Sequence, residues 1–331
     1  MIWLAFALVA IAIVWAGSNL SRLGDQIATI TGLTRSWIGV ILLATATSLP
    51  ELFTGVSSSL QDLPDIAAGD ALGSCLVNLL ILGIVLVVDR GRSGLSLAHS
   101  SHLVAGSLGV LTLTLTGLGL AAATAWPVLG WIGLPSLLLI IAYILVMRLL
   151  YILEQKEAQM SESELGVSQP EYGEPDPWRL YRSFGLNALA VVVAASFLPA
   201  IAEQIAISTG LAQAFVGNIF VATVTSLPEM VVSAAALRLG AIDMAIGNLL
   251  GSNLFNLAIL GLDDLVYTKG FMLQSANPAL LVTLIGTIAM GAVLIFGIVW
   301  RSAGYRLRFP WDALAMIGLY AGTIALLSRM S

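Results

Sequence analysis

The sequence predicts an all-α integral membrane protein with ten transmembrane helices, arranged as two inverted five-helix repeats. Three observations predict this fold class. The 331 residues are 58% hydrophobic and only 10% charged, whereas soluble domains average about 25% charged residues. Long apolar windows recur along the chain, and its two halves carry the same motifs at a constant offset of 178 residues.

Composition also excludes several classes of protein. A soluble core of this apolarity would have too little polar surface to cover it. A net charge of −5 with scattered basic residues gives no electrostatic footprint for nucleic acid. The single cysteine, Cys75, cannot form an intramolecular disulfide and belongs to no CxxC metal pattern.

Apolar windows of about 20 residues, the length that crosses a bilayer, define the individual spans. The polar stretch from Glu154 to Arg182 is rich in Glu and Pro, and it buries too little apolar area to fold alone. We therefore expect one repeat over 1–152, an acidic linker over 153–182 and a second repeat over 183–331. The predicted helices cover residues 2–20, 36–60, 65–88, 101–122, 128–152, 183–208, 212–237, 241–262, 277–299 and 311–329.

Basic residues predict how these spans are oriented. If the N-terminus lies outside, only Lys269 and Arg329 are placed on the outer side. This is a strong positive-inside bias, so we expect both termini outside and the linker in the cytoplasm. The basic residues then placed inside are Arg22, Arg35, Arg90, Arg92, Arg148, Lys156, Arg179, Arg182, Arg238, Arg301, Arg306 and Arg308.

The two halves carry matching motifs. LLATATSLPELF at 42–53 matches FVATVTSLPEMV at 220–231, and GDALGSCLVNLLILG at 69–83 matches GNLLGSNLFNLAILG at 247–261. Over the 40 positions that begin at Ala44, 19 residues are identical without a gap, which composition alone does not explain. Five spans per half require the second half to enter the membrane upside down. Inverted repeats are typical of secondary transporters, whose sites lie near mid-membrane.

Glu51 and Glu229 are the strongest candidates for a functional role. Each lies deep in an apolar helix, where an ionised side chain costs about 2.5–3.5 kcal/mol even on the insertion scale. No Lys or Arg is expected at the same depth, so the two acids need a bound cation or protons. The alternative is a protonated glutamate bonded to a neighbouring helix, but the repeat favours one shared midplane site.

Proline and hydroxyl residues precede both acids. Pro50 and Pro228 each remove a helical N–H, which makes carbonyls over 44–47 and 222–225 available to a ligand. One Ser/Thr pair beside Pro usually satisfies a helix kink, whereas a doubled pair followed by Glu favours ligand binding. The hydroxyl residues are Thr47, Ser48, Thr225 and Ser226.

The partner helices each present a polar face. Asp70, Ser74 and Asn78 are four residues apart and share one helix face, as do Asn248, Ser252 and Asn256. The glycines at 69, 73, 247 and 251 have the small-xxx-small spacing of close helix contacts, and we interpret them as packing residues.

Together these groups predict an all-oxygen site with a charge near −2. Hard cations such as calcium take about six to eight oxygen ligands. The sequence offers no His or Cys cluster for zinc, copper or iron, and we expect His99 and His102 at the membrane interface.

The motifs resemble those of the sodium/calcium exchanger branch of the calcium/cation antiporter superfamily. That branch carries G-T-S-x-P-E on one helix and G-N-x-x-G-S-N on the next, in each repeat. Here they stand as A-T-S-L-P-E at 46–51 with G-D-A-L-G-S-C at 69–75, and V-T-S-L-P-E at 224–229 with G-N-L-L-G-S-N at 247–253. The resemblance covers nearly the whole chain once the ten-span architecture is included.

The resemblance implies an antiporter that exchanges calcium against sodium by alternating access, in which helices 1 and 6 slide across a rigid core. It implies that the two glutamates bind both ions and that helix-3 and helix-8 positions contribute. The implied ligands are Glu51 and Glu229 for calcium and sodium, Thr47 and Thr225 for calcium, Ser48, Ser226, Ser74 and Ser252 for sodium, and the Ala44 and Ala222 carbonyls, with Asn78 and Asn256 where some members carry an acid.

The chain departs from the family motifs at four positions. Ala46 and Val224 replace the motif glycine, and Asp70 and Cys75 replace asparagines. Asp70 is either a third acid in the cavity or a residue at the wet end of its helix. These changes bear on ion stoichiometry and selectivity rather than on the transport class.

Other functions are considered. A proton/calcium antiporter, or an antiporter for another divalent cation, would use the same acids, but the usual proton-branch motif G-N-x-T-E is absent. A passive channel fits an occluded carboxylate pair less well, and the remote histidines argue against an intramembrane enzyme. We expect no enzymatic activity, no cofactor and no obligatory protein partner. The ligands are transported calcium and sodium ions, and the setting is a lipid bilayer, the prokaryotic inner membrane.

Overall fold

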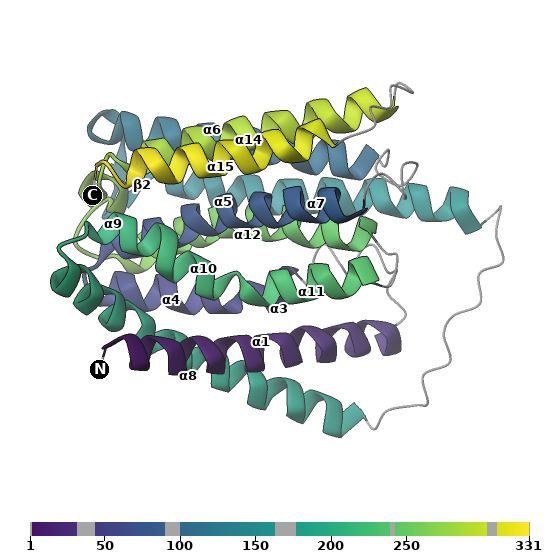
Figure 1. The fold of residues 1–331 in the computed structure, drawn as a ribbon, viewed down its shortest axis with the longest axis horizontal. Helices are drawn as coiled ribbons and strands as arrows, with labels where there is room; N and C mark the ends of the chain where they lie inside the picture. The colour runs from purple at the N-terminus through teal and green to yellow at the C-terminus, as the bar shows by residue number, and fades with distance from the viewer. Residues whose placement is uncertain are drawn as a thin grey trace.

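The computed structural model describes residues 2–31, 44–89, 100–162, 177–238, 242–302 and 310–330. Its helices lie roughly side by side in one elongated bundle, and both chain termini lie at the same end of it (Figure 1). We call this the termini end.

The first half contains five long or paired helical segments and a short β-hairpin near the termini end. A break at Ser48 separates two helical pieces of its second segment. The elements are α1 (Ile2–Thr31), α3 (Ala44–Thr47), α4 (Leu49–Leu60), α5 (Pro64–Asp89), α6 (Ser100–Ala121), the 3-10 turn η3 (Ala123–Ala125), β1 (Val128–Leu129), β2 (Ile132–Gly133) and α7 (Leu134–Glu162).

The second half repeats this order, with a π-helical turn, η4, that was not predicted. Its second segment is bent by 43° where α10 meets α11. The elements are α8 (Pro177–Thr209), α9 (Gln213–Val216), η4 (Gly217–Val221), α10 (Ala222–Thr225), α11 (Leu227–Arg238), α12 (Ile242–Val266), α13 (Met272–Ser275), α14 (Leu280–Ser302) and α15 (Trp311–Leu327).

Within the described residues, seven helices are long and apolar enough to cross a membrane, or eight if the bent pair is one span. α15 is shorter, at 17 residues, and the helix predicted over 36–60 begins outside the described residues. The count of ten spans therefore stays a prediction.

One predicted helix start is wrong. Residues 128–133 form the β1–β2 hairpin, in which Val128 pairs with Gly133, and α7 begins only at Leu134. Gly130 turns the hairpin with a φ of +70°, a left-handed conformation that glycine adopts without steric cost. α7 and α8 also extend into both ends of the predicted linker, and residues 163–176 lie outside the described part.

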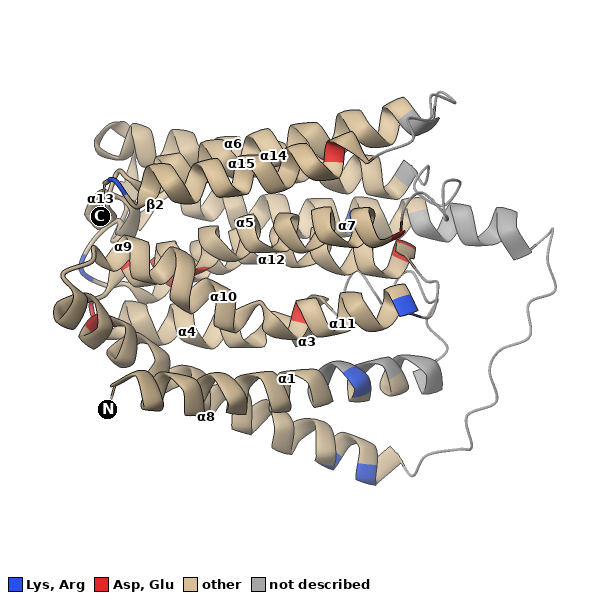
Figure 2. Cartoon of the chain, viewed as in Figure 1, with Lys and Arg blue, Asp and Glu red and all other residues tan. Residues whose placement is uncertain are grey.

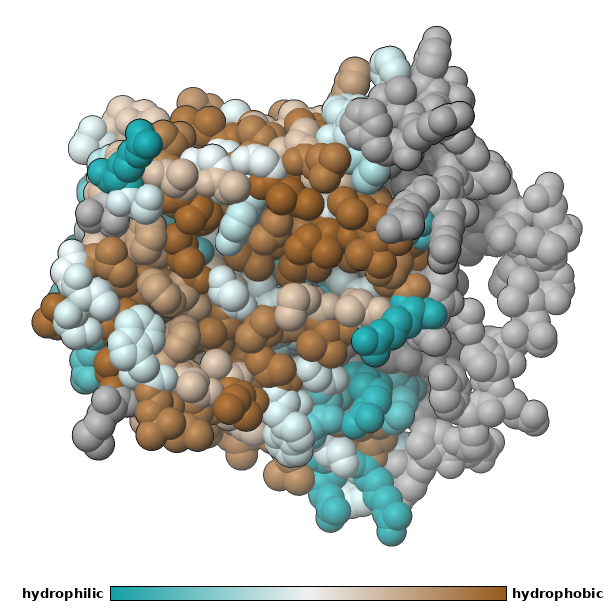
Figure 3. All heavy atoms as spheres, viewed as in Figure 1, coloured by the Kyte–Doolittle hydropathy of each residue, from teal (hydrophilic) through white to brown (hydrophobic). Residues whose placement is uncertain are grey.

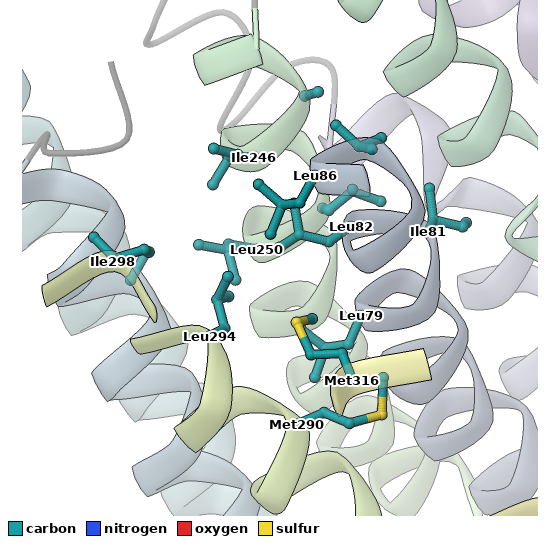
Figure 4. Close-up of a cluster of buried hydrophobic side chains, with 14 of the residues drawn as sticks. Leu79, Ile81, Leu82, Leu86, Ile246, Leu250, Met290, Leu294, Ile298 and Met316 are labelled. Atoms are coloured by element: carbon teal, nitrogen blue, oxygen red, sulfur yellow. The ribbon is translucent and has the colours of Figure 1, made fainter. Parts of the chain in front are cut away.

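α5 and α12 form the centre of the bundle. About four-fifths of the α5 span (78%) and 89% of the α12 span are buried, against 17% of the span in α1. Figure 4 shows one apolar cluster around them, in which Leu79 and Leu82 of α5 lie near Leu250 of α12 and Met290 of α14. Because these two helices carry the polar faces predicted from the sequence, their burial places those faces inside the protein.

Contacts between the halves come in exchanged pairs. α6 packs against α12 and α14 packs against α5, while α7 packs against α12 and α15 against α5. The two first helices of the halves, α1 and α8, pack against each other at the side of the bundle. Each helix thus has a counterpart with equivalent neighbours in the other half.

The outer surface has the character of a membrane protein. Figure 3 shows an apolar band across the middle of the visible face, with hydrophilic residues toward the ends. The basic residues that the structure describes lie near the helix ends, mainly at the end where α8 begins (Figure 2). The protein is therefore an integral membrane protein, as predicted.

Asp264 fastens the hairpin to the termini end of α12. Its carboxylate accepts the Gly133 N–H at 2.9 Å and the Met272 N–H at 2.6 Å. We expect Asp264→Asn, which leaves one of two acceptor oxygens, to lower the free energy of unfolding by about 1.5 kcal/mol. Thermal unfolding of the purified protein in detergent measures this change. Asp243→Asn on the same helix, where the acid is partly exposed, should cost no more than about 0.5 kcal/mol; an equal loss at both positions would contradict the anchoring role.

Candidate cation site

Glu51 and Glu229 meet serines of the opposite half. The Ser48 hydroxyl donates to Glu229 Oε1 at 2.8 Å, and the Ser226 hydroxyl donates to Glu51 Oε1 at 3.2 Å. Both glutamates are 0% exposed. Two equivalent hydrogen bonds therefore cross between the halves and bring the two predicted acids to one place.

Helix breaks position these acids. The helical segments are interrupted at Ser48 and Ser226, and new helices begin immediately afterwards. Pro50 is tolerated there because the first turn of a helix needs no N–H from it. Each glutamate consequently lies in the first turn of α4 or α11, where the helix dipole favours negative charge.

The carbonyl groups at the breaks are partly engaged. Ala44 O accepts from Ser48 N at 3.0 Å and from the Thr47 hydroxyl at 3.2 Å. Ala222 O accepts in the same way, from the amide and the threonine hydroxyl of its own break. The prolines remove the N–H partners of a different pair, the carbonyls of Ala46 and Val224, four residues earlier. The ligand role of Ala44 and Ala222 stays a prediction.

Serines and threonines link the broken helices to α5 and α12. The Ser252 hydroxyl donates to Glu229 Oε1 at 3.3 Å. The hydroxyls of Ser74 and Thr225 lie 3.3 Å apart, and the Thr47 hydroxyl lies 3.5 Å from Asn248 Oδ1. These contacts assemble hydroxyl oxygens from both halves around the acids.

Asp70 is a third acid of this cluster. Its Oδ1 accepts from the Thr225 hydroxyl at 2.8 Å, and only 1% of the residue is exposed. The same Thr225 hydroxyl lies 3.3 Å from the Ser74 hydroxyl, one turn further along α5. Of the two alternatives that the sequence left open, the structure therefore favours an acid of the cavity over a residue at the wet end of the helix.

The two asparagines predicted on these helices lie differently. Asn78 Nδ2 donates to Asn253 Oδ1 at 3.1 Å. Asn256 is fully buried, and neither of its amide atoms has a hydrogen-bond partner among the described residues. Neither asparagine bonds a carboxylate, and their ligand roles stay predictions.

A contact that sequence reasoning missed lies between α5 and α12. The Cys75 thiol donates to Asn253 O at 3.6 Å, and Asn253 Nδ2 donates to Cys75 O at 3.3 Å. These two residues occupy equivalent motif positions, so the signal was present in the repeat. Their mutual contact is what a two-fold relation between the halves produces at its axis.

Three carboxylate oxygens of the cluster remain without a hydrogen-bond partner in the described part of the chain: Glu51 Oε2, Glu229 Oε2 and Asp70 Oδ2. Buried charges are costly unless they are paired or bind a cation. In the part of the chain that the structure describes, no group of three His, Cys, Asp or Glu side chains is arranged to hold a metal ion. Hydroxyl, amide or carbonyl oxygens must therefore complete any cation site here.

The structure thus brings together nine of the predicted residues and separates others. His102 lies elsewhere, in the first turn of α6, where it is buried with its Nε2 3.2 Å from Asp243 Oδ1; its place at the membrane interface stays a prediction, and His99 lies outside the described residues. The residues brought together are Glu51, Glu229, Thr47, Thr225, Ser48, Ser226, Ser74, Ser252 and Asp70.

A bundle of apolar helices around buried, uncompensated acids at two helix breaks is the architecture of a membrane cation transporter. The chain belongs to the sodium/calcium exchanger protein family, whose sequence profile matches residues 1–152 and 181–329. The resemblance drawn from the motifs is thereby confirmed, and the chain is a cation antiporter of the exchanger type.

Individual relatives have modest identity. The inner membrane protein YrbG of Escherichia coli is 29% identical over 264 residues, which cover 77% of this chain and 76% of YrbG. The putative antiporter CaxA of Alkalimonas amylolytica is 28% identical over 79% of this chain and 80% of its own. The sodium/calcium exchanger MaX1 of Methanosarcina acetivorans is 31% identical over 43% of this chain and 39% of its own length.

Solved structures of the sodium-calcium exchanger NCX_Mj share the fold. One of them, soaked with sodium and strontium, superposes with a TM-score of 0.63 at 22% sequence identity, and the match covers 98% of this chain and 99% of the other. At this identity the match establishes the fold alone.

Proposed function

We propose that this protein exchanges calcium against sodium by alternating access, with both ions bound at the all-oxygen site between α4, α5, α11 and α12. The observation that carries the proposal is the crossed pair of bonds, from Ser48 to Glu229 and from Ser226 to Glu51. Each bond occupies one carboxylate oxygen and leaves the other without a hydrogen-bond partner among the described residues.

Shared acids explain why the two fluxes would be coupled. A calcium ion neutralises two carboxylates, and sodium ions bound to the same carboxylates do likewise, so the two cargoes compete for one set of charges. Without cargo, burial of the acids opposes movement of the site across the membrane. The site therefore favours exchange over free leakage.

Alternating access requires part of the protein to move, because the acids have no exposed surface in the present conformation. α1 and α8 are suited to this movement: they pack against each other beside the bundle, whereas α5 and α12 are enclosed. We propose that α1 and α8 slide along the core to open the site to either side. We place the protein in a prokaryotic inner membrane, with the termini end outside and the linker in the cytoplasm.

Uptake of ⁴⁵Ca²⁺ into sodium-loaded proteoliposomes tests this function. Dilution into sodium-free buffer is expected to raise calcium uptake about tenfold or more over vesicles with equal sodium on both sides, because outward sodium flux drives the exchange. Protein-free vesicles are the control.

Other outcomes identify other functions. Uptake driven by a pH gradient in sodium-free buffer would retain the site and replace sodium by protons. Calcium flux that needs no counter-ion would indicate a channel. No calcium movement under either gradient would contradict calcium as the cargo.

A further inference from the structure

Asp263 is a fourth buried acid, which the exchange site described above does not use. It lies near the termini end of α12, is 0% exposed, and neither of its carboxylate oxygens has a hydrogen-bond partner in the described residues. No salt bridge to it is found there either. An uncompensated carboxylate in this position is costly, so its presence calls for a ligand.

Glycine 55 makes room for this carboxylate on α4. A Cβ atom placed on Gly55 would lie 2.6 Å from Asp263 Oδ1 and 2.8 Å from its Cγ, too close for any other residue without a shift. The acid therefore lies directly against the α4 backbone. Gly55 is four residues beyond Glu51, on the same helix face and one turn nearer the termini end.

A hydroxyl group lies on this face as well. Thr54, three residues after Glu51, is fully buried, and its Oγ1 has no hydrogen-bond partner among the residues described. Spacings of three and four place Thr54 and Gly55 side by side above Glu51. Because Thr54 directly precedes Gly55, against which Asp263 lies, its hydroxyl is available as a neutral ligand alongside the charged oxygens of the carboxylate.

Asp70 connects this acid to the central pair. Asp70 belongs to α5, which packs against both α4 and α12, the helices that carry Gly55 and Asp263, and its Oδ1 accepts from the Thr225 hydroxyl of the central cluster. Asp70 Oδ2 also has no hydrogen-bond partner. Carboxylates therefore continue from the central site toward the termini end.

The opposite half has no such acid. The residue equivalent to Asp263 is Val85, and the residue equivalent to Gly55 is Ser233, both of which are buried. The repeat therefore does not require an acid here, and the extra charge lies on only one side of the central pair.

A proton alone does not satisfy these groups. A protonated Asp263 would still leave its carbonyl oxygen unsatisfied, because no donor among the described residues lies within hydrogen-bond distance of either oxygen. A hard cation is coordinated directly by both carboxylate oxygens, and water molecules can fill its remaining coordination sites. We propose that Asp263, with Asp70 and the Thr54 hydroxyl, forms a second site for calcium or sodium, one helical turn from the central pair toward the termini end.

This inference rests on the proposed function, so its test separates the two. Binding of ⁴⁵Ca²⁺ and of ²²Na⁺ is measured on purified protein carrying Glu51→Gln and Glu229→Gln, which disables the central pair. We expect this double variant to retain saturable binding of at least one of the two ions. Adding Asp263→Asn should weaken that remaining binding about tenfold or more, a loss typical of removing one charged ligand.

Two further variants control for folding. Asp312→Asn removes an equally buried aspartate on α15, where it lies against Gly297 of α14, and should leave the remaining binding within about twofold. Gly55→Ala leaves the charge in place but adds a methyl group where the Asp263 carboxylate lies, and it should weaken binding as Asp263→Asn does. If Asp263→Asn is not recovered as folded protein, ion binding is measured on Gly55→Ala in its place.

The outcomes are distinct. If the wild type exchanges calcium but the double variant binds neither ion, or binds equally with and without Asp263→Asn, the second site is wrong and the proposed function stands. If the wild type neither exchanges calcium nor binds either ion, both proposals fail.

Discussion

Glu51→Gln and, separately, Glu229→Gln are expected to lower sodium-driven calcium uptake by a factor of about 100 or more. Glutamine preserves the shape of the side chain and an acceptor for the crossed serine bond, but it removes one negative charge from a buried site. The substitution removes one partner of a buried ion pair, the carboxylate that faces the bound cation. Such a loss costs about 3 kcal/mol or more, which corresponds to a factor of about 100 or more.

Stability separates this effect from misfolding. An ionised carboxylate is costly to bury without a cation, so neutralising one of the acids should leave the thermal midpoint of the cation-free protein unchanged or raise it. Calcium should then raise the midpoint less than we expect it to in the wild type. Glu203→Gln on α8, outside the site, is the matched control and should retain normal uptake. Uptake that persists unaltered in both site variants would show that the acids were assigned wrongly.

Gly73→Val is expected to lower the free energy of unfolding by about 3 kcal/mol and to abolish transport, because over-packing a close helix contact forces the backbones apart. A Cβ on Gly73 would lie 2.7 Å from the Asn218 Cα and 2.8 Å from the Ala222 Cβ. The neighbouring contact between Ser74 and Thr225 depends on this approach of α5 to the π-helical turn η4.

Gly117→Val is the matched control for this prediction. Gly117 lies within α6, and nothing lies within 4 Å of the position that its Cβ would take. The control should stay within about 1 kcal/mol of the wild type, since only intrinsic helix preferences change. Thermal unfolding and calcium uptake are measured on both variants. Equal losses at the two glycines would mean that the contact with η4 is unimportant.

The sequence was most informative where the two halves agree. The repeated SLPE and GS motifs predict Glu51 and Glu229, together with their flanking hydroxyls, as one group, and these side chains do lie together in the structure. A duplicated polar residue in an apolar helix is conspicuous because apolar helices tolerate few polar groups. The same duplication places equivalent residues at equivalent contacts, which is why the serines and glutamates meet in a reciprocal way.

Features confined to one half escaped prediction. The hairpin over 128–133 consists of apolar residues, so hydropathy could not distinguish it from the start of a helix. The π-helical turn η4 has no characteristic amino-acid composition that would reveal it in the sequence. It packs against Gly69 and Gly73, which belong to the other half of the chain. Asp263 was overlooked because it lies beside the repeated motif, near the end of a span where an acid is ordinarily attributed to the interface.

The crossed bonds between serines and glutamates also bear on how such a protein can evolve. Ser48 works with Glu229 and Ser226 with Glu51, so a half-gene cannot assemble a complete site from its own residues. Substitutions in one half must be matched by substitutions in the other, as in an obligate pair of subunits. After an ancestral duplication the two copies could diverge elsewhere, as the buried Asp263 and Val85 have done, but not in the serines and glutamates that each copy lends to the other.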